Sequence, residues 1–327
     1  MNSSNRRRIL LTGATGFVGR FLVPLLQKQG YDVHVLLREK QAVQTLSYSG
    51  AIPAYTIIGN LACLEETDST LIKAFEQADY VIHCAGLAHA FDKADDEPYQ
   101  KTNTQSTRIL SRLAAQQGVR RFILVSSVRA QCGPVSSKIL TESDPFAPTD
   151  AYGRSKRDAE LFLEQEFQQS NMDWVALRPV LIYGTQVKGN MSSLVRLAQT
   201  PFPLPLAGFS GKRSILSLEN LGEAILTLLN TDLMLRCPLL VADDDPLTIG
   251  EMVSALRKGM HRKDLLINIP EQFFGIVARF FGKQEAFLRI SGSLQVDTHA
   301  LKALGWKPLH SSQKGLEALG RMLLSGS

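Results

Sequence analysis

Over its first 178 residues the chain alternates short apolar runs with longer segments in which apolar residues recur at helical spacing. The apolar runs are rich in β-branched residues and predict strands over residues 9–12, 33–37, 80–84, 122–126 and 174–178. The intervening segments predict helices over residues 17–29, 68–76, 98–117 and 151–169. Because strands and helices alternate, we predict an α/β fold with a parallel, doubly wound sheet.

This rhythm ends after Pro179, where closely spaced prolines mark a loop-rich stretch. Helical patterns then follow over residues 219–230 and 248–260. We therefore expect a smaller second domain to begin near residue 179.

The first predicted strand leads directly into a glycine-rich turn. Gly13, Gly16 and Gly19 are spaced three apart between this strand and the following helix. Glycines let the backbone approach a phosphate closely, and the helix N-terminus offers free N–H groups and the positive end of its dipole. The order of strand, turn and helix predicts a pyrophosphate site in a Rossmann-type domain, although the spacing differs from the commoner G-x-G-x-x-G. An ordinary glycine-rich turn is the alternative.

A second candidate site combines a tyrosine, a lysine and a serine. Tyr152 and Lys156 are four residues apart in a predicted helix and therefore share one face. Ser126 and Ser127 end an apolar strand, at the edge where ligands bind in open α/β sheets. A phenol has a reference pKa of about 10, and a nearby ammonium lowers it by favouring the phenolate. The pair predicts a general acid/base, whereas the alternative is a packed Tyr152 and a Lys156 that points into solvent.

Further short pieces accompany these motifs, in a consistent order along nearly the whole chain. The pieces are Thr12–Gly19, Gly59–Leu61, His83–Leu87, Asn103, Val125–Ser127, Tyr152–Lys156, Leu177–Pro179 and Gly189–Asn190. Together they resemble the extended short-chain dehydrogenases/reductases, and in particular their nucleotide-sugar branch of NAD-dependent epimerases and dehydratases. The resemblance implies an NAD(P)-dependent enzyme with a dinucleotide-binding domain over residues 1–178 and 214–236 and a nucleotide-sugar domain over residues 179–213 and 237–327.

The resemblance also implies roles for the catalytic residues. Tyr152 is expected to exchange a proton with a sugar hydroxyl or ketone, and Ser127 to orient the same oxygen. Lys156 is expected to lower the pKa of the phenol and to bind the nicotinamide ribose. Ser126 is the alternative to Ser127 if the alignment is shifted by one residue.

The implied cofactor-binding residues follow the glycine turn and the ends of the strands. They are Gly13, Thr15, Gly16, Phe17, Val18, Gly19, Arg38, Asn60, Leu61, Ala85, Gly86, Leu87, Asn103, Tyr152, Lys156 and Pro179. In this fold an acidic residue about 20 positions past the glycines holds the ribose of NAD, whereas an arginine accommodates the 2′-phosphate of NADP. Leu37 stands at the acidic position and Arg38 follows it, which favours NADP(H). The alternative is a solvated Arg38 paired with Glu39.

The resemblance implies chemistry at C4 of a UDP-sugar. A UDP-sugar 4-epimerase would act through a transient 4-keto intermediate. The alternative is an NADPH-dependent 4-ketoreductase of a UDP-4-keto-6-deoxy sugar. The substrate-binding residues that it implies are Ser127, Asn190, Arg213, Arg289 and Asp297. A setting in polysaccharide biosynthesis is implied in the same way.

Two other activities are disfavoured, and a third stays open. Dehydratases of this branch carry acidic residues after the serine, whereas Val128 and Arg129 stand there, which argues against 4,6-dehydration. A non-catalytic dinucleotide-binding protein is disfavoured because Ser127, Tyr152 and Lys156 are all present. A reductase of non-sugar ketones on the same scaffold is a third possibility, and missing diphosphate contacts at Asn190 and Arg213 would favour it.

The composition of the chain bears on whether it binds nucleic acid, a membrane or a metal. The net charge of +5 comes without a basic stretch interleaved with aromatics, so we expect no nucleic-acid partner. Neither an apolar leader nor a run of about 18 uncharged apolar residues is visible, so we expect no membrane span and a cytoplasmic location. Four scattered cysteines and six histidines lack metal-ligand spacing, so we expect no metal.

Two further expectations concern surfaces. Residues 273–281 form the most apolar segment, and we expect a core-facing helix there, with a partner or membrane surface as the alternative. The resemblance also allows a homodimer through the predicted helices at residues 98–117 and 151–169.

Overall fold

The computed structural model describes residues 6–49, 52–88, 96–168, 172–185, 189–282 and 284–325. These residues form two compact units. The first comprises the described residues of Met1–Gln131, Pro145–Arg178 and Ile225–Leu239, and the second those of Cys132–Asp144, Pro179–Ala224 and Leu240–Ser327. The chain passes between the units more than once, so neither unit is a continuous segment. The functional domains expected from the sequence stay a prediction.

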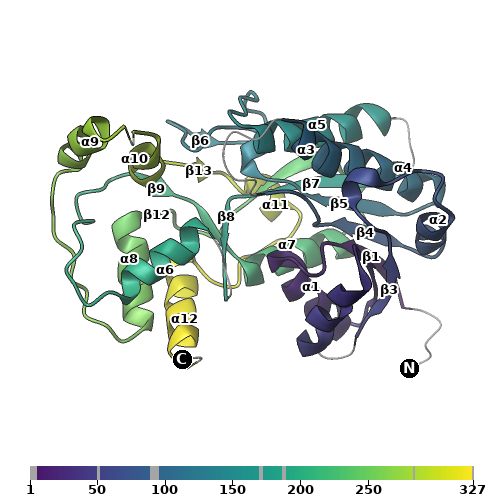
Figure 1. The fold of residues 1–327 in the computed structure, drawn as a ribbon, viewed down its shortest axis with the longest axis horizontal. Helices are drawn as coiled ribbons and strands as arrows, with labels where there is room; N and C mark the ends of the chain where they lie inside the picture. Colours follow the sequence, from purple (N-terminus) through teal and green to yellow (C-terminus); the bar gives the residue numbers. More distant parts are fainter. Residues whose placement is uncertain are drawn as a thin grey trace. The chain divides into compact units, whose positions relative to one another are not determined.

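The first unit is built around a seven-stranded sheet (Figure 1). Its strands are β1 (Arg8–Thr12), β2 (Asp32–Leu37), β3 (Ala54–Ile57), β4 (Tyr80–His83), β5 (Arg121–Val125), β7 (Asp173–Pro179) and β11 (Arg236–Val241). The order is β11-β7-β5-β4-β1-β2-β3, and the pairs from β7 through β3 are parallel. The chain proceeds outward from β1 in both directions, so the predicted doubly wound parallel sheet is confirmed.

Four of the five strands that the sequence predicted are almost wholly buried, and the fifth, β2, is buried except at Asp32 and His34. Ile9, Leu10 and Leu11 of β1 are all fully buried, as expected for a parallel strand covered by helices on each side. The structure adds β3 and β11, which were not predicted. β3 is an edge strand with a largely exposed Tyr55, so it lacks the continuous apolar run that marks the others.

Helices lie on both sides of this sheet, with α4 and α5 on one side and α1 on the other (Figure 1). The helices of this unit are α1 (Phe17–Lys28), α2 (Ser69–Phe75), α3 (Asp96–Tyr99), α4 (Ser106–Gln116) and α5 (Ala151–Glu166), together with the second half of α7 (Leu218–Asn230), whose first half belongs to the second unit. Leu71, Leu113 and Leu163 of three of these helices share one core cluster with Phe122 of β5. The predicted helix over residues 98–117 is interrupted by a π-helical turn, Gln100–Gln105.

The second unit packs helices together with short strand pairs. Its helices are α6 (Asn190–Gln199), α8 (Ile249–Gly259), α9 (Glu271–Phe280), α10 (Gln284–Ser291), α11 (His299–Ala303) and α12 (Ser312–Ser325). Its strands are β6 (Ile139–Leu140), β8 (Leu181–Tyr183), β9 (Lys212–Arg213), β10 (Ile215–Ser217), β12 (Leu247–Thr248) and β13 (Gln295–Val296). The predicted helix over residues 248–260 is confirmed as α8, which Thr248 and Glu251 begin with a capping box.

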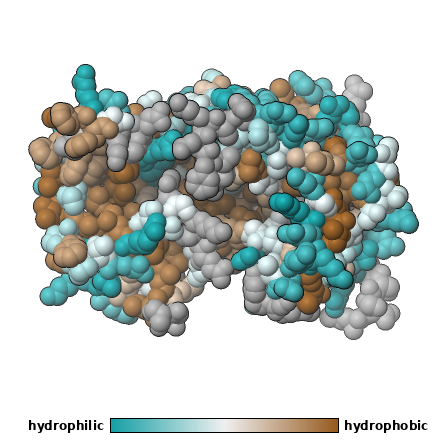
Figure 2. Space-filling model, in the orientation of Figure 1, coloured by the Kyte–Doolittle hydropathy of each residue, from teal (hydrophilic) through white to brown (hydrophobic). Residues whose placement is uncertain are grey.

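The apolar segment 273–281 only partly meets the expectation of a core-facing helix. It forms most of α9, and Phe274 packs against the buried Phe209 with ring centroids 5.4 Å apart. Phe273, Ile276 and Phe280 are instead exposed, Phe280 to 85%. Figure 2 shows hydrophobic residues at the surface over α9 and α10. No helix in the described ranges is long and apolar enough to cross a membrane.

Candidate functional site

Three glycines shape the turn between β1 and α1. Gly13 has a φ of +75°, in the left-handed region that favours glycine. A β-carbon on Gly13 would lie 2.6 Å from the Ala85 nitrogen, and one on Gly19 would lie 2.1 Å from the Gly13 carbonyl oxygen. Gly16 is the N-cap of α1 and makes no side-chain bond to the first N–H groups of the helix. The turn therefore offers close backbone approach and an open helix N-terminus, which suit a phosphate.

Gly13→Ala tests this geometry. We expect it to lower the free energy of unfolding by about 1–3 kcal/mol, because the new methyl group must displace the main chain at Ala85. We also expect weaker dinucleotide binding. Urea denaturation and cofactor titration measure the two effects. Gly30→Ala is the matched control, since Gly30 has a φ of +87° but no atom lies within 4 Å of its β-carbon position. Equal effects of the two substitutions would contradict the role of the close approach.

The turn after β4 is held against the glycine turn by buried polar contacts. The Ala85 N–H donates to Thr12 Oγ1 at 3.2 Å, and Thr12 Oγ1 and His83 Nδ1 are 2.7 Å apart. His83 is fully buried, and burial together with the positive charge of Lys156 lowers its pKa to about 3. Its imidazole is therefore neutral near pH 7 and serves as a hydrogen-bonding group.

Asn103, on the π-helical turn, connects residues 85–87 to α5. The Leu87 N–H donates to Asn103 Oδ1 at 2.7 Å, and Asn103 Nδ2 donates to the Ser155 hydroxyl at 2.9 Å. A β-carbon on Gly86 would lie 2.8 Å from Asn103 Oδ1 and 3.3 Å from Lys156 Nζ. The fold thus brings the glycine turn, the turn after β4, Asn103 and Lys156 together.

Tyr152 lies in the first turn of α5. Asp150 is the N-cap of this helix, and its Oδ1 accepts a hydrogen bond from the Gly153 N–H at 2.7 Å. The Tyr152 phenol shares a hydrogen bond with the Ser127 side chain. Ser127 Oγ also accepts from the Arg129 N–H at 3.1 Å, which leaves its own hydrogen for the phenol.

Opposing influences act on the Tyr152 phenol. Burial raises its pKa above the ordinary value, and the hydrogen bond from Ser127 lowers it. The negative charge of Asp150 raises the pKa and the positive charge of Arg129 lowers it, and Tyr99 raises it as well. Arg129 and Asp150 were not singled out as site residues from the sequence, although Asp150 stands where a helix cap is expected.

Lys156 is enclosed by the first unit. It is 5% exposed, and its Nζ donates to the Val125 carbonyl oxygen at 3.0 Å. Burial lowers its pKa to about 8. The alternative in which Lys156 points into solvent is therefore wrong. Its ammonium faces the end of β5 and the turn at Gly86.

A buried ion pair supports the end of β5. Arg178 Nη2 and Glu160 Oε2 are 2.6 Å apart, and their side chains are 0% and 2% exposed. The Ser126 hydroxyl donates to Glu160 Oε1. Ser126 is therefore engaged in this pair, whereas Ser127 is the serine that contacts Tyr152.

Other predicted cofactor residues lie at the N-terminus of α1. Thr15 precedes the N-cap, and Phe17 and Val18 are the first two residues of the helix. Their roles toward a cofactor stay predictions.

The remaining predicted cofactor residues lie after three other strands. Leu37 ends β2 and is buried, whereas Arg38 is exposed. Asn60 Oδ1 accepts from the Ala62 N–H at 3.1 Å and caps the short helix Leu61–Cys63. Pro179 is the last residue of β7. For these residues too, contact with a cofactor stays a prediction.

The other predicted substrate residues belong to the second unit. Arg213 donates to the carbonyl oxygens of Gly292 and Pro134, each at 2.9 Å. Arg289 is exposed on α10, and Asp297 is exposed after β13. Asn190 begins α6, and its side chain lies outside the described part of the structure. Their substrate roles stay predictions.

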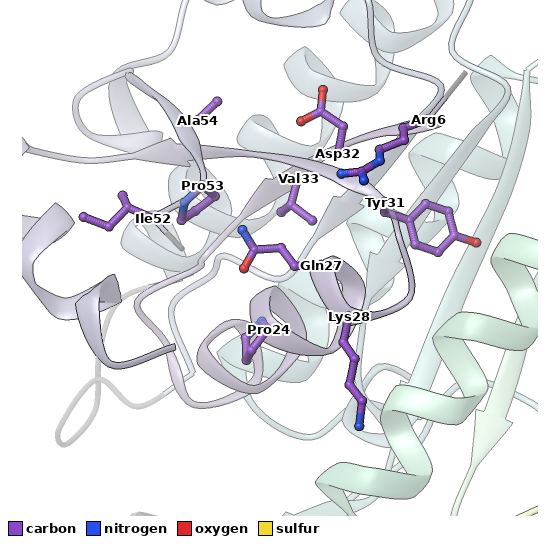
Figure 3. A pocket seen from close by; sticks show the side chains of 10 residues that line it. All are labelled: Arg6, Pro24, Gln27, Lys28, Tyr31, Asp32, Val33, Ile52, Pro53 and Ala54. Atoms are coloured by element: carbon purple, nitrogen blue, oxygen red, sulfur yellow. The ribbon is translucent and has the colours of Figure 1, made fainter. Parts of the chain in front are cut away.

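A cavity of about 520 Å³ lies elsewhere in the first unit (Figure 3). Pro24, Tyr31, Asp32 and Pro53 are among the residues that line it. It opens where β2 and β3 begin, whereas ligands of such sheets bind where the strands end. Because none of the predicted site residues lines it, it is not the candidate active site.

Comparison with known proteins matches residues 9–234 to the model of the NAD dependent epimerase/dehydratase family. UDP-glucose 4-epimerase from Vibrio cholerae is 33% identical, over 98% of this chain and 97% of its own. The structure of UDP-N-acetylglucosamine 4-epimerase from Bacillus cereus matches with a TM-score of 0.75 at 18% identity, covering 97% of this chain and 99% of that one. UDP-glucuronic acid 4-epimerase from Bacillus cereus, in complex with NAD, matches with a TM-score of 0.73 at 18% identity, covering 98% of each chain. The two structural matches show a shared fold.

Proposed function

This chain belongs to the NAD-dependent epimerase/dehydratase family, and we propose that it inverts C4 of a UDP-sugar through a transient 4-keto sugar. The observation that carries the proposal is the placement of Tyr152, hydrogen-bonded to Ser127, on the helix whose Lys156 reaches the turn beside the glycines. The relative from Vibrio cholerae, named a UDP-glucose 4-epimerase, supports the choice of reaction.

The first unit fits a nicotinamide dinucleotide. The open N-terminus of α1 and the glycine turn suit its pyrophosphate. Asn103 keeps the Gly86 turn close to Lys156, whose ammonium would bind the nicotinamide ribose. A nicotinamide held there would supply the hydride acceptor for oxidation of the sugar carbon and the hydride donor for its reduction.

The chain's own residues handle the proton. Tyr152 takes the proton from the C4 hydroxyl during oxidation and returns one during reduction. Ser127 donates to the phenol oxygen, holds it in place and favours its ionised form. Lys156 lies on the same face of α5, but its ammonium donates to the Val125 carbonyl oxygen, and apart from burial itself the groups that shift the pKa of the phenol are Ser127, Asp150, Arg129 and Tyr99.

The diphosphate would need charged and amide donors from the second unit. We assign Arg213, Asn190 and Arg289 to the diphosphate and Asp297 to the nucleotide ribose. The absence of acidic side chains at Val128 and Arg129 supports epimerisation over 4,6-dehydration. This chemistry fits a cytoplasmic enzyme of polysaccharide synthesis. We also propose that two copies pair through α4 and α5.

The test is an assay of the purified protein with UDP-glucose, UDP-N-acetylglucosamine and UDP-glucuronic acid. We expect one of them to be interconverted with its C4 epimer, with no net consumption of nicotinamide. If none of the three UDP-sugars is epimerised while the cofactor is bound, the proposal is contradicted.

One observation favours a second candidate, an NADPH-dependent 4-ketoreductase. Leu37 occupies the position of the acidic residue that would hold the NAD ribose, and the exposed Arg38 follows it. Stoichiometric consumption of NADPH with a UDP-4-keto-6-deoxy sugar, without interconversion of epimers, would support this candidate.

Arg38→Ala tests the preference for the phosphorylated cofactor. We expect the Kd for NADP(H) to rise about tenfold or more, because an arginine–phosphate contact is worth about 1.5–3 kcal/mol. The Kd for NAD(H) should change little. Titration of both cofactors by fluorescence measures the difference, and equal losses would remove the reason to prefer NADP(H).

A further inference from the structure

We propose that Arg129 and Asp150 form an electrostatic control on Tyr152, in which the guanidinium favours the ionised phenol and the carboxylate opposes it. The inference rests on the proposed function, because it concerns the acid/base of that reaction. Both are positioning residues: they act through Tyr152.

The ion pair joins the two segments that carry Ser127 and Tyr152. Arg129 lies on the short helix η5 (Val128–Ala130), directly after Ser127, and Asp150 is the N-cap of α5. Arg129 Nη2 and Asp150 Oδ2 are 2.6 Å apart. The other carboxylate oxygen caps the N–H of Gly153, one residue past Tyr152. One carboxylate thus anchors both the guanidinium and the first turn of α5.

Main-chain packing holds η5 against the first turn of α5. A β-carbon on Gly153 would lie 2.4 Å from the Arg129 carbonyl oxygen, so η5 and the first turn of α5 are in close contact. The Arg129 N–H donates to Ser127 Oγ at 3.1 Å, and the same hydroxyl is bonded to the Tyr152 phenol. The Arg129 side chain therefore acts on the phenol by its charge, whereas its main-chain N–H, which a substitution at this position retains, holds the Ser127 hydroxyl.

Only part of the Arg129 guanidinium is hydrogen-bonded. Its Nη1 is buried and has no hydrogen-bond partner within the described residues, whereas Nη2 bonds Asp150 and Thr149. The Arg129 side chain is 19% exposed and that of Asp150 is 47% exposed. Charges at such partly buried sites act on neighbouring groups more strongly than they would in bulk water.

Other groups also face the phenol. The ring of Tyr99, on α3, lies edge-on with its centroid 6.3 Å away. Lys156 follows on the same helix but donates to the Val125 carbonyl oxygen. Among these groups, Arg129 and Asp150 form the oppositely charged pair whose members can be neutralised one at a time.

The experiment compares the pH profiles of kcat/KM for Arg129→Gln and Asp150→Asn. Loss of the cation raises the pKa of the phenol, so the rising limb of the first profile moves to higher pH. Loss of the anion lowers that pKa, so the rising limb of the Asp150→Asn profile moves to lower pH. Below the wild-type midpoint we expect activity to fall about three- to tenfold in Arg129→Gln and to rise by a similar factor in Asp150→Asn.

Both substitutions break the same ion pair, and asparagine retains the oxygen that caps α5. A purely structural pair would therefore impair both variants without opposite shifts, and that result would overturn the proposal. Arg129→Lys keeps the charge and should restore the wild-type profile. If Arg129→Gln does not fold, a profile in Arg129→Lys that differs from wild type, or an unmoved limb in Asp150→Asn, overturns it equally.

A second readout does not depend on turnover. Titration of tyrosinate absorbance, taken as the difference between each protein and its Tyr152→Phe counterpart, reports the phenol directly. Its midpoint should move in the same two directions. A wild-type protein without epimerase activity would contradict the proposed function, whereas an active protein with unmoved midpoints would contradict only the control by Arg129 and Asp150.

Discussion

We expect the Tyr152→Phe enzyme to turn over about 10²- to 10⁴-fold more slowly than wild type, the range that a positioned general acid/base contributes. The substitution removes only the oxygen that is hydrogen-bonded to Ser127. The ring is retained, and with it the edge-on packing against Tyr99. The loss should therefore fall on kcat and arise from the missing proton transfer.

Cofactor binding separates this effect from a general disturbance of the site. The glycine turn and Asn103 are untouched, so the Kd for the dinucleotide should stay within about twofold of wild type. Tyr31→Phe is the matched control: Tyr31 loses a hydroxyl that bonds Asn230, near the amino ends of the strands. Its kcat should be unchanged. Turnover of Tyr152→Phe close to that of the control would refute the acid/base role.

The second large effect is expected on stability. Glu160→Ala should lower the free energy of unfolding by about 3–5 kcal/mol, because it leaves the Arg178 guanidinium buried without its counter-charge. Arg178 is fully buried, and its Nη1 donates to the amide oxygen of Gln131, a neutral group that cannot replace the carboxylate. Urea denaturation followed by circular dichroism measures the change.

The control for this substitution is an ion pair at the surface. Asp96 and Arg154 are also 2.6 Å apart, but their side chains are 48% and 44% exposed. Solvent screens such a pair, so Asp96→Ala should leave the urea midpoint nearly unchanged. If both substitutions had similar small effects, the buried pair would not stabilise the end of β5 as described.

Glu160→Ala should also reduce activity. Ser126 would lose its acceptor, and Ser127, the next residue, holds the Tyr152 phenol. The stability and the catalytic geometry of this edge are therefore coupled through one carboxylate.

Much of the first unit could be predicted because its signals are local. A strand buried on both faces is a continuous apolar run, and the glycines of the β1–α1 turn are read directly from the sequence. β3 escaped prediction because an exposed edge strand has no such run. The prediction that α9 faces the core was only partly right. Phe274 packs inward, whereas the neighbouring Phe273 is exposed.

The charged pairs of the candidate site could not be predicted in this way. Arg129 and Asp150 are 21 residues apart, and Glu160 and Arg178 are 18 apart. The first pair meets only when η5 packs against the start of α5, and the second only when α5 packs against β7. Tyr152 and Lys156 could be predicted because residues four apart share one face of a helix. A contact between two different elements produces no regular spacing in the sequence.

The contact between the two turns of the dinucleotide site has a genetic consequence. The atoms that a β-carbon on Gly13 would meet are the nitrogen and α-carbon of Ala85 and the carbonyl carbon of Cys84, all of them main-chain atoms. Every amino acid carries these atoms, so no exchange of side chain at position 84 or 85 can make room. Second-site suppressors of a Gly13 mutation should therefore be sought where they can shift a whole turn.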